Sequence, residues 1–233
     1  MKPCPNCEAE NEPDVYFCHK CGYAFPQDKL ITDSTSPERS EKGAIEHLKK
    51  GYTIALNQPI VFLPSIIAGL LGILVGYLPG NIGYNTLLIG LVSSTISFIL
   101  GFASTDMSRD AYFNQPLELG RSVNYIVGRF FEFLVAAIVG GLLSITIILI
   151  PVVIFMFVIM VIDETGMWDS FSIALDVIRS DIGDVLVILL ISIVASAVVG
   201  YVPYICNLLE AMINVVVGIA FIDVYVTYKN NHT

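Results

Sequence analysis

The stretch that decides the fold is IPVVIFMFVIMVIDETGMWDSFSIALDVIRSDIGDVLVILL, residues Ile150–Leu190. It opens with a proline and an apolar run, passes through an acidic turn and an amphipathic segment, and ends in a second apolar run. Within the amphipathic part, Trp168–Ser180, apolar side chains recur at helical spacing opposite charged ones. This alternation is typical of membrane proteins in which some helices cross the lipid and others lie along its surface.

Two further segments repeat this pattern earlier in the chain. Ala44–Asn57 and Leu117–Arg129 are amphipathic, and each precedes enough apolar sequence for a helical hairpin. Three units of interfacial helix plus hairpin predict an all-α membrane bundle of about six transmembrane helices over residues 44–229. An ordinary helix packed on the bundle is the alternative for each amphipathic segment, because an apolar stripe alone does not identify its partner. In the first segment the stripe comprises Ile45, Leu48, Tyr52 and Leu56.

The apolar run Phe130–Ile162 is too long for one comfortable span. Its 33 residues would form a helix of roughly 50 Å, against a hydrocarbon core of about 30 Å. Pro151 lies inside the run and disfavours a continuous helix. We therefore expect a break here, with Gly140, Gly141 and Ser144 forming a close turn just before the proline.

Composition and charge agree with a membrane protein. Of the 233 residues, 55% are hydrophobic and 14% are charged, whereas an average soluble domain carries about 25% charged residues. The net charge of −9 argues against a nucleic-acid partner, because phosphate binding requires a basic surface. Residues Met1–Gly51 hold seven of the twelve basic residues, so we expect a small polar head before the apolar domain.

The basic residues also predict an orientation in the cell membrane. With six spans, all twelve Lys and Arg fall on one side, and the opposite loops Pro79–Asn85 and Pro203–Asn207 carry none. The positive-inside rule then places both termini in the cytoplasm. A five-span topology remains open, since it would move only Arg179 and Lys229 to the outside.

Four cysteines in the head predict a metal site. Two Cys-x-x-Cys pairs, Cys4 with Cys7 and Cys18 with Cys21, can complete the four-coordinate shell that Zn²⁺ prefers. The polar start carries no secretory signal, so we expect the thiols to stay reduced in the cytosol. The zinc would be structural, because four thiolates leave no open position for catalysis and about 25 residues bury too little surface to fold alone. A redox dithiol is the alternative.

Residues Lys2–Phe25 resemble the short zinc-ribbon modules found at the termini of many bacterial and archaeal proteins. The resemblance implies a ribbon over residues 1–25, and its one departure is Glu8, where the first knuckle usually carries Gly. The acidic loop between the cysteine pairs favours a protein partner over nucleic acid. Residues 26–43 are polar, rich in Ser and Thr and contain two prolines, which indicates a flexible linker.

The pattern of Ile150–Leu190 is also similar to a six-helix integral membrane domain shared by several poorly characterised bacterial and archaeal families. Relatives of that domain include the membrane domain attached to some glycerophosphodiester phosphodiesterases. The resemblance implies six spans with a broken fourth helix. It implies no catalytic residues, because those enzymes carry their chemistry in a separate soluble domain.

Ionisable and amide side chains in apolar runs are the remaining candidates for function. Glu132 follows Arg129 and is expected to pair with it, whereas Glu210 and Asp223 are expected near span ends. Only Asn214 is expected at depth, where a lone Asn usually bonds a neighbouring helix. The sequence also predicts solvated positions for the charged cluster Asp106, Arg109 and Asp110, and the three histidines His19, His47 and His232 all lie in polar regions.

These observations predict a non-enzymatic multi-pass membrane protein with a cytosolic zinc-ribbon docking module, acting as a membrane scaffold or adaptor. The expected partners are the lipid bilayer and a protein bound by the ribbon, and no small-molecule substrate is identifiable. The alternative is a transporter or channel-like subunit with a broken helix near Pro151. A lipid-modifying enzyme has no supporting constellation of residues.

Overall fold

The computed structural model describes residues 2–5, 9–11, 43–76, 84–201 and 206–232. The chain divides into two units, Met1–Glu41 and Lys42–Thr233. In the first unit, β1 (Lys2–Pro3) pairs antiparallel with β2 (Glu10–Asn11). Cys4 directly follows β1 and is buried, and its amide donates a hydrogen bond to the carbonyl of Ala9 at 2.9 Å.

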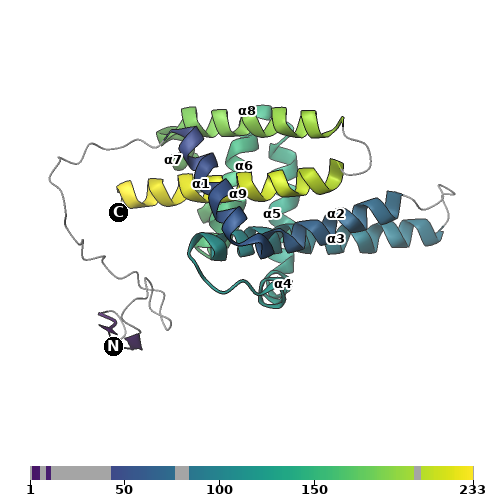
Figure 1. Ribbon diagram of the computed structural model, residues 1–233, viewed down its shortest axis with the longest axis horizontal. Helices are drawn as coiled ribbons and strands as arrows, with labels where there is room; N and C mark the ends of the chain where they lie inside the picture. Colours follow the sequence, from purple (N-terminus) through teal and green to yellow (C-terminus); the bar gives the residue numbers. More distant parts are fainter. Residues whose placement is uncertain (1, 6–8, 12–42, 77–83, 202–205, 233) are drawn as a thin grey trace. The chain divides into compact units, whose positions relative to one another are not determined.

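Every element described in the second unit is helical (Figure 1). The predicted break in the third apolar run is present: α5 ends at Leu143, and α6 begins at Ile150 with Pro151 in its first turn. A proline at that position removes no intrahelical hydrogen bond. The elements are α1 (Ala44–Asn57), η1 (Pro59–Phe62), α2 (Leu63–Gly76), α3 (Tyr84–Tyr112), α4 (Leu119–Gly128), α5 (Phe130–Leu143), η2 (Ile147–Leu149), α6 (Ile150–Ile162), α7 (Met167–Ser180), α8 (Ile182–Val199) and α9 (Cys206–His232).

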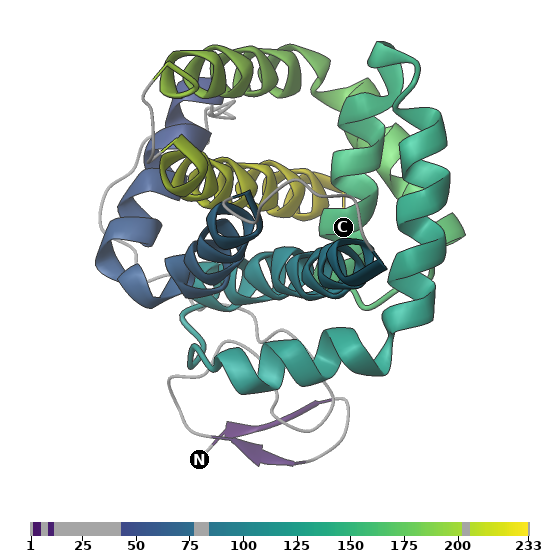
Figure 2. The same ribbon diagram turned by 90° about the vertical axis from the view of Figure 1, so that its right-hand side faces the viewer.

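Helices α3, α8 and α9 are each long and apolar enough to cross a membrane, giving three candidate spans among the described residues. The number rises to five if two bent pairs, α1 with η1–α2 and α4 with α5, each count as one span. The bends in these pairs are 99° and 76°. The helices α5 and α6 run across the direction of the long helices in both ribbon views (Figures 1 and 2). The structure therefore gives three to five candidate spans, fewer than the six expected.

The described helices form three hairpins, α2–α3, α5–α6 and α8–α9. The core lies where their second helices meet. Helices α3, α6 and α9 contact one another, and nine of the thirteen residues of α6 are buried. Around them, α4 packs on α3, α7 packs on α6 and α1 packs on α9. Each amphipathic helix thus rests on the hairpin before it, and α1, which follows none, rests on the last hairpin of the chain.

Helix α1 has two different faces. Its predicted apolar stripe is largely exposed: Ile45 is 73% accessible, and Tyr52 and Leu56 are each more than half accessible. The face that packs on α9 instead carries small or polar residues, Ala44, His47, Gly51 and Ala55. The small residues let the two helix backbones approach closely.

Gly51 marks the closest approach, and we predict that Gly51→Ala destabilises the domain. A Cβ atom there would lie 2.5 Å from the carbonyl oxygen of Val216 and 3.1 Å from the amide of Ala220, both backbone atoms of α9. We expect a loss of roughly 1–3 kcal/mol, measured as a lower melting temperature in detergent. The control is Gly72→Ala in α2, where a Cβ meets nothing within 4 Å. Equal melting temperatures for both variants would contradict this packing.

Candidate functional site

The predicted zinc ligands fall largely outside the described residues. Cys4 is described and buried, whereas Cys7, Cys18 and Cys21 lie in segments whose structure is not described. The four-thiolate site therefore stays a prediction from the sequence.

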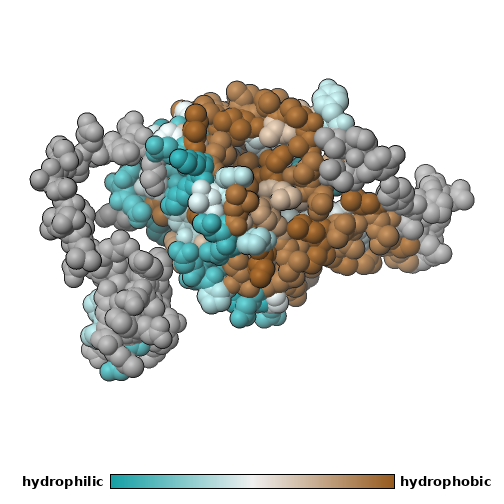
Figure 3. All heavy atoms as spheres, in the orientation of Figure 1, coloured by the Kyte–Doolittle hydropathy of each residue, from teal (hydrophilic) through white to brown (hydrophobic). Residues whose placement is uncertain are grey.

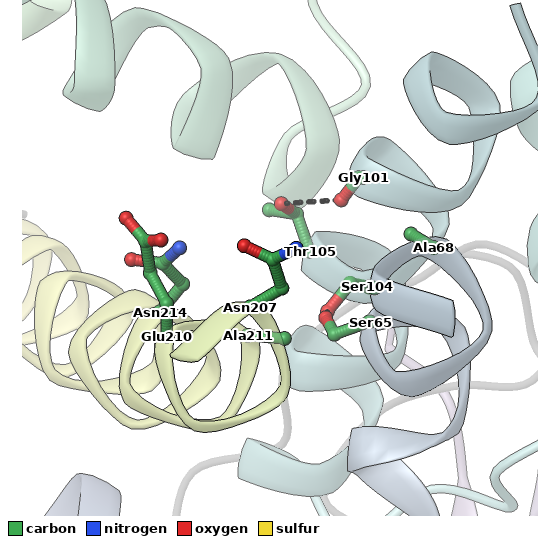
Figure 4. A pocket seen from close by; sticks show the side chains of 10 residues that line it. Ser65, Ala68, Gly101, Ser104, Thr105, Asn207, Glu210, Ala211 and Asn214 are labelled. Atoms are coloured by element: carbon green, nitrogen blue, oxygen red, sulfur yellow. Dashed lines mark hydrogen bonds between the residues drawn. The ribbon is translucent and has the colours of Figure 1, made fainter. Parts of the chain in front are cut away.

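A polar groove opens between α2, α3 and α9, with a volume of about 320 Å³ (Figure 4). Asn214 and Glu210 project from α9 on the same side, and Asn207 lies one turn before Glu210 (Figure 4). Opposite them, the hydroxyls of Ser65 in α2 and Ser104 in α3 are hydrogen-bonded at 2.7 Å. Asn214, which the sequence places at membrane depth, has an exposed side chain that lines this groove.

The carboxylate of Asp223 ties three helices together at the polar end of the second unit. Its Oδ2 accepts a hydrogen bond from Nδ1 of His47 at 2.7 Å. Its Oδ1 accepts from Nζ of Lys50 and from the hydroxyl of Tyr112, both at 2.6 Å. Asp223 and His47 are both fully buried. The group joins α1, α3 and α9.

A second charged group joins α3 to α4. The guanidinium of Arg109 pairs with Asp106 at 2.8 Å and with Asp110 at 3.2 Å. Arg121 of α4 pairs with the same two carboxylates, which are both buried. The prediction of a solvated cluster is therefore wrong. Arg109 also donates to the carbonyl of Val161 at 2.9 Å, which satisfies an acceptor at the end of α6.

Two further pairs hold the ends of α5, α6 and α9. Arg129 makes a two-bond contact with Glu132, with both distances 2.8 Å, as the sequence predicted, and also donates to the carbonyl of Thr165. Asp163, directly after α6, accepts hydrogen bonds from the hydroxyl of Tyr225 and from Nζ of Lys229 in α9. Together with the Asp223 group, these contacts connect helices from all three hairpins.

Sequence reasoning missed this polar network because it treated charges near span ends as solvated. One signal was available in α1. Ala44, Gly51 and Ala55 form a small-residue face at helical spacing, and His47 and Lys50 lie on or beside it. A histidine within a small-residue packing face is placed against the neighbouring helix, where a buried acidic partner is required.

Comparison with known proteins finds no family model, no curated protein and no solved structure that matches this chain.

We predict that Asp223→Ala destabilises the domain by about 1–3 kcal/mol, because it leaves the buried ring of His47 and the partly exposed ammonium of Lys50 without their shared carboxylate. The measurement is thermal unfolding in detergent. The matched control is Asp176→Ala, which removes an exposed carboxylate whose contact with Arg179 is 3.5 Å. Exposed pairs contribute about 0–1 kcal/mol. If the two variants unfold at the same temperature, the Asp223 group does not hold the helices together.

Proposed function

We propose that the chain is a non-enzymatic multi-pass membrane protein that acts as a scaffold or adaptor, with a cytosolic zinc ribbon as its docking module. The observation that carries the proposal is the separation of surfaces in the helical unit. Hydrophilic side chains gather at one end, and apolar side chains cover the rest of the visible face (Figure 3). Large apolar residues are exposed along α2, α3 and α8, which is the surface a bilayer would cover.

The amphipathic helices lie in the membrane interface in this proposal. The 99° bend after α1 and the 76° bend after α4 are close to the right angle between a helix on the surface and a helix across the core. The exposed apolar stripe of α1 supports the same placement, as does Trp168 of α7, whose side chain is 70% accessible. Tryptophan is enriched at the boundary between lipid and water.

Six helices enter the lipid in the proposal, as the hairpins α2–α3, α5–α6 and α8–α9. The α5–α6 pair is the shortest, because 14 and 13 residues give lengths of only about 20 Å. Its turn carries exposed Ile145, Ile147 and Ile148 beside the polar Ser144 and Thr146. The exposed isoleucines favour contact with lipid. Because α5 and α6 run across the direction of the long helices (Figures 1 and 2), this pair enters the lipid without crossing it alongside them. The polar end, with its arginines and lysines, faces the cytoplasm and holds both termini there.

The ribbon is tested by removing its metal. We expect one zinc per purified chain, and we expect Cys18→Ser combined with Cys21→Ser to lose it, measured by elemental analysis. Crosslinking in native membranes followed by mass spectrometry should then lose the proteins that the wild-type chain recovers. The control is Cys206→Ser in α9, which removes a free thiol outside the head. An unchanged set of crosslinked proteins would refute the docking role, and a chain without zinc would refute the ribbon.

A transporter or channel-like subunit is the second candidate function, and the groove favours it. Glu210, Asn214 and Asn207 present a carboxylate and two amides to one cavity in a helix that otherwise qualifies as a span. Polar side chains facing a cavity at membrane depth are typical of pathways for polar solutes. The groove is therefore the place where this candidate can be distinguished from a plain scaffold.

Cysteine labelling of intact cells tests the topology and the groove together. We expect a membrane-impermeant maleimide to modify the native Cys206 from outside. In a chain that also carries Cys206→Ser, an Asp169→Cys variant at exposed Asp169 of α7 should react only after permeabilisation, and the same background serves the groove variants below. Reaction of Cys206 from the cytoplasmic side alone would refute the six-span arrangement.

For the groove, Asn214→Cys should react with a charged thiosulfonate if water fills it, whereas the exposed apolar control Val198→Cys should not. If neither Asn214→Cys nor Val198→Cys reacts, the transporter proposal is wrong.

A further inference from the structure

In the Asp223 group, only one of the two ring nitrogens of His47 is hydrogen-bonded. Its Nδ1 lies 2.7 Å from Oδ2 of Asp223, and because a carboxylate only accepts, the ring must donate from Nδ1. In the neutral ring this fixes the tautomer and leaves a lone pair on Nε2. The Nε2 atom is buried and has no hydrogen-bond partner within the described part of the chain.

Two carboxylates of α8 approach the same ring. One ring nitrogen of His47 and one carboxylate oxygen from each of Asp181 and Asp184 lie within 4.8 Å of one another. Since Nδ1 is engaged by Asp223, Nε2 is the atom available to a ligand. Atoms bound to one metal ion at about 2.0–2.2 Å are at most about 4.4 Å apart, so small side-chain shifts bring these three into one coordination shell.

The local charge favours a cation at this point. Asp181, Asp184 and Asp223 bring three carboxylates close to the ring of His47. A divalent ion would offset the mutual repulsion of carboxylates in a partly buried cluster.

A carboxylate has about four acceptor positions, so an existing partner does not prevent Asp181 or Asp184 from also binding an ion. Asp181 is the N-cap residue of α8, yet its side chain makes no capping hydrogen bond. Asp184 accepts one hydrogen bond, from the amide of Ala44 at 2.8 Å, and a carboxylate has about four acceptor positions. That bond places Asp184 against the start of α1 and leaves room for a metal ion.

We propose that His47, Asp181 and Asp184 bind a divalent first-row transition metal ion. One imidazole nitrogen with carboxylate oxygens suits Mn²⁺, Fe²⁺, Co²⁺ or Zn²⁺, whereas Mg²⁺ and Ca²⁺ prefer oxygen alone. Asp223 is a positioning residue, because its bond to Nδ1 orients the ring and makes Nε2 a better ligand. The ion clamps α1 to the start of α8. The site is independent of the predicted ribbon and of the proposed scaffold role.

The test uses the full chain in detergent and Mn²⁺ as the probe, because Mn²⁺ suits oxygen and imidazole ligands better than the thiolates of the head. We expect one Mn²⁺ per chain by electron paramagnetic resonance, with a nitrogen coupling from the imidazole. His47→Asn keeps an amide that can donate to Asp223 but removes the ligand, and Asp184→Asn removes a carboxylate. Each should weaken Mn²⁺ binding at least tenfold, and His47→Asn should abolish the nitrogen coupling.

The matched controls are His232→Asn in α9 and Asp169→Asn in α7, both exposed positions away from the cluster. They should bind Mn²⁺ as the wild type does. Mn²⁺ should also raise the melting temperature of the wild type and of the controls but not of His47→Asn. The proposal is overturned if the wild type shows no stoichiometric binding or no nitrogen coupling, or if the ligand variants bind as tightly as the controls. The nitrogen coupling is measured on the wild type, so its absence overturns the proposal even if a variant fails to fold.

Discussion

The buried carboxylate of Asp223 is the constraint on which the arrangement of the helical unit depends. An ionised group in so buried a position is strongly destabilising unless charge and hydrogen bonds compensate for the lost water. His47, Lys50 and Tyr112 supply that compensation from two other helices. If any of the three donors moved away, the buried carboxylate of Asp223 would lose part of this compensation. The carboxylate therefore fixes the positions of α1 and α3 against α9 more strictly than apolar contact alone would.

Helix α1 packs on α9 with one face and presents its other face to the surroundings of the protein. Its small-residue face, centred on Gly51, allows a backbone approach to α9 that larger side chains would prevent. Its large apolar residues, such as Ile45 and Tyr52, then necessarily point outward. An apolar stripe on a helix is usually read as the side that packs on the protein. When the stripe is exposed, the partner it requires is another apolar phase, which in this chain is the proposed membrane interface.

Helical periodicity predicted much of the fold, and it could not predict the polar network. The bounds of α1 match the predicted segment Ala44–Asn57, and the break before Pro151 follows from the length of one apolar run. Both properties are local. The bond between His47 and Asp223 joins residues 176 positions apart. The small-residue face of α1 indicates that His47 packs on another helix, but nothing near it indicates which residue is its partner. For the same reason Asp106 and Asp110 were expected in solvent, because their partner Arg121 lies on a separate helix.

The order of the helices gives the polar contacts between α1 and α9 a particular role. Helices α4 and α7 each rest on the hairpin that immediately precedes them, so a short connection already holds them close to their partners. Helix α1 has no such connection, and its partner is the last helix of the chain. Closing that long loop costs more conformational entropy than closing a short one, because the cost grows with the number of residues enclosed. Charge-assisted hydrogen bonds are roughly twice as strong as neutral ones. The bonds that Asp223 accepts from His47 and Lys50 add such interactions at the α1–α9 contact, where chain connectivity contributes least.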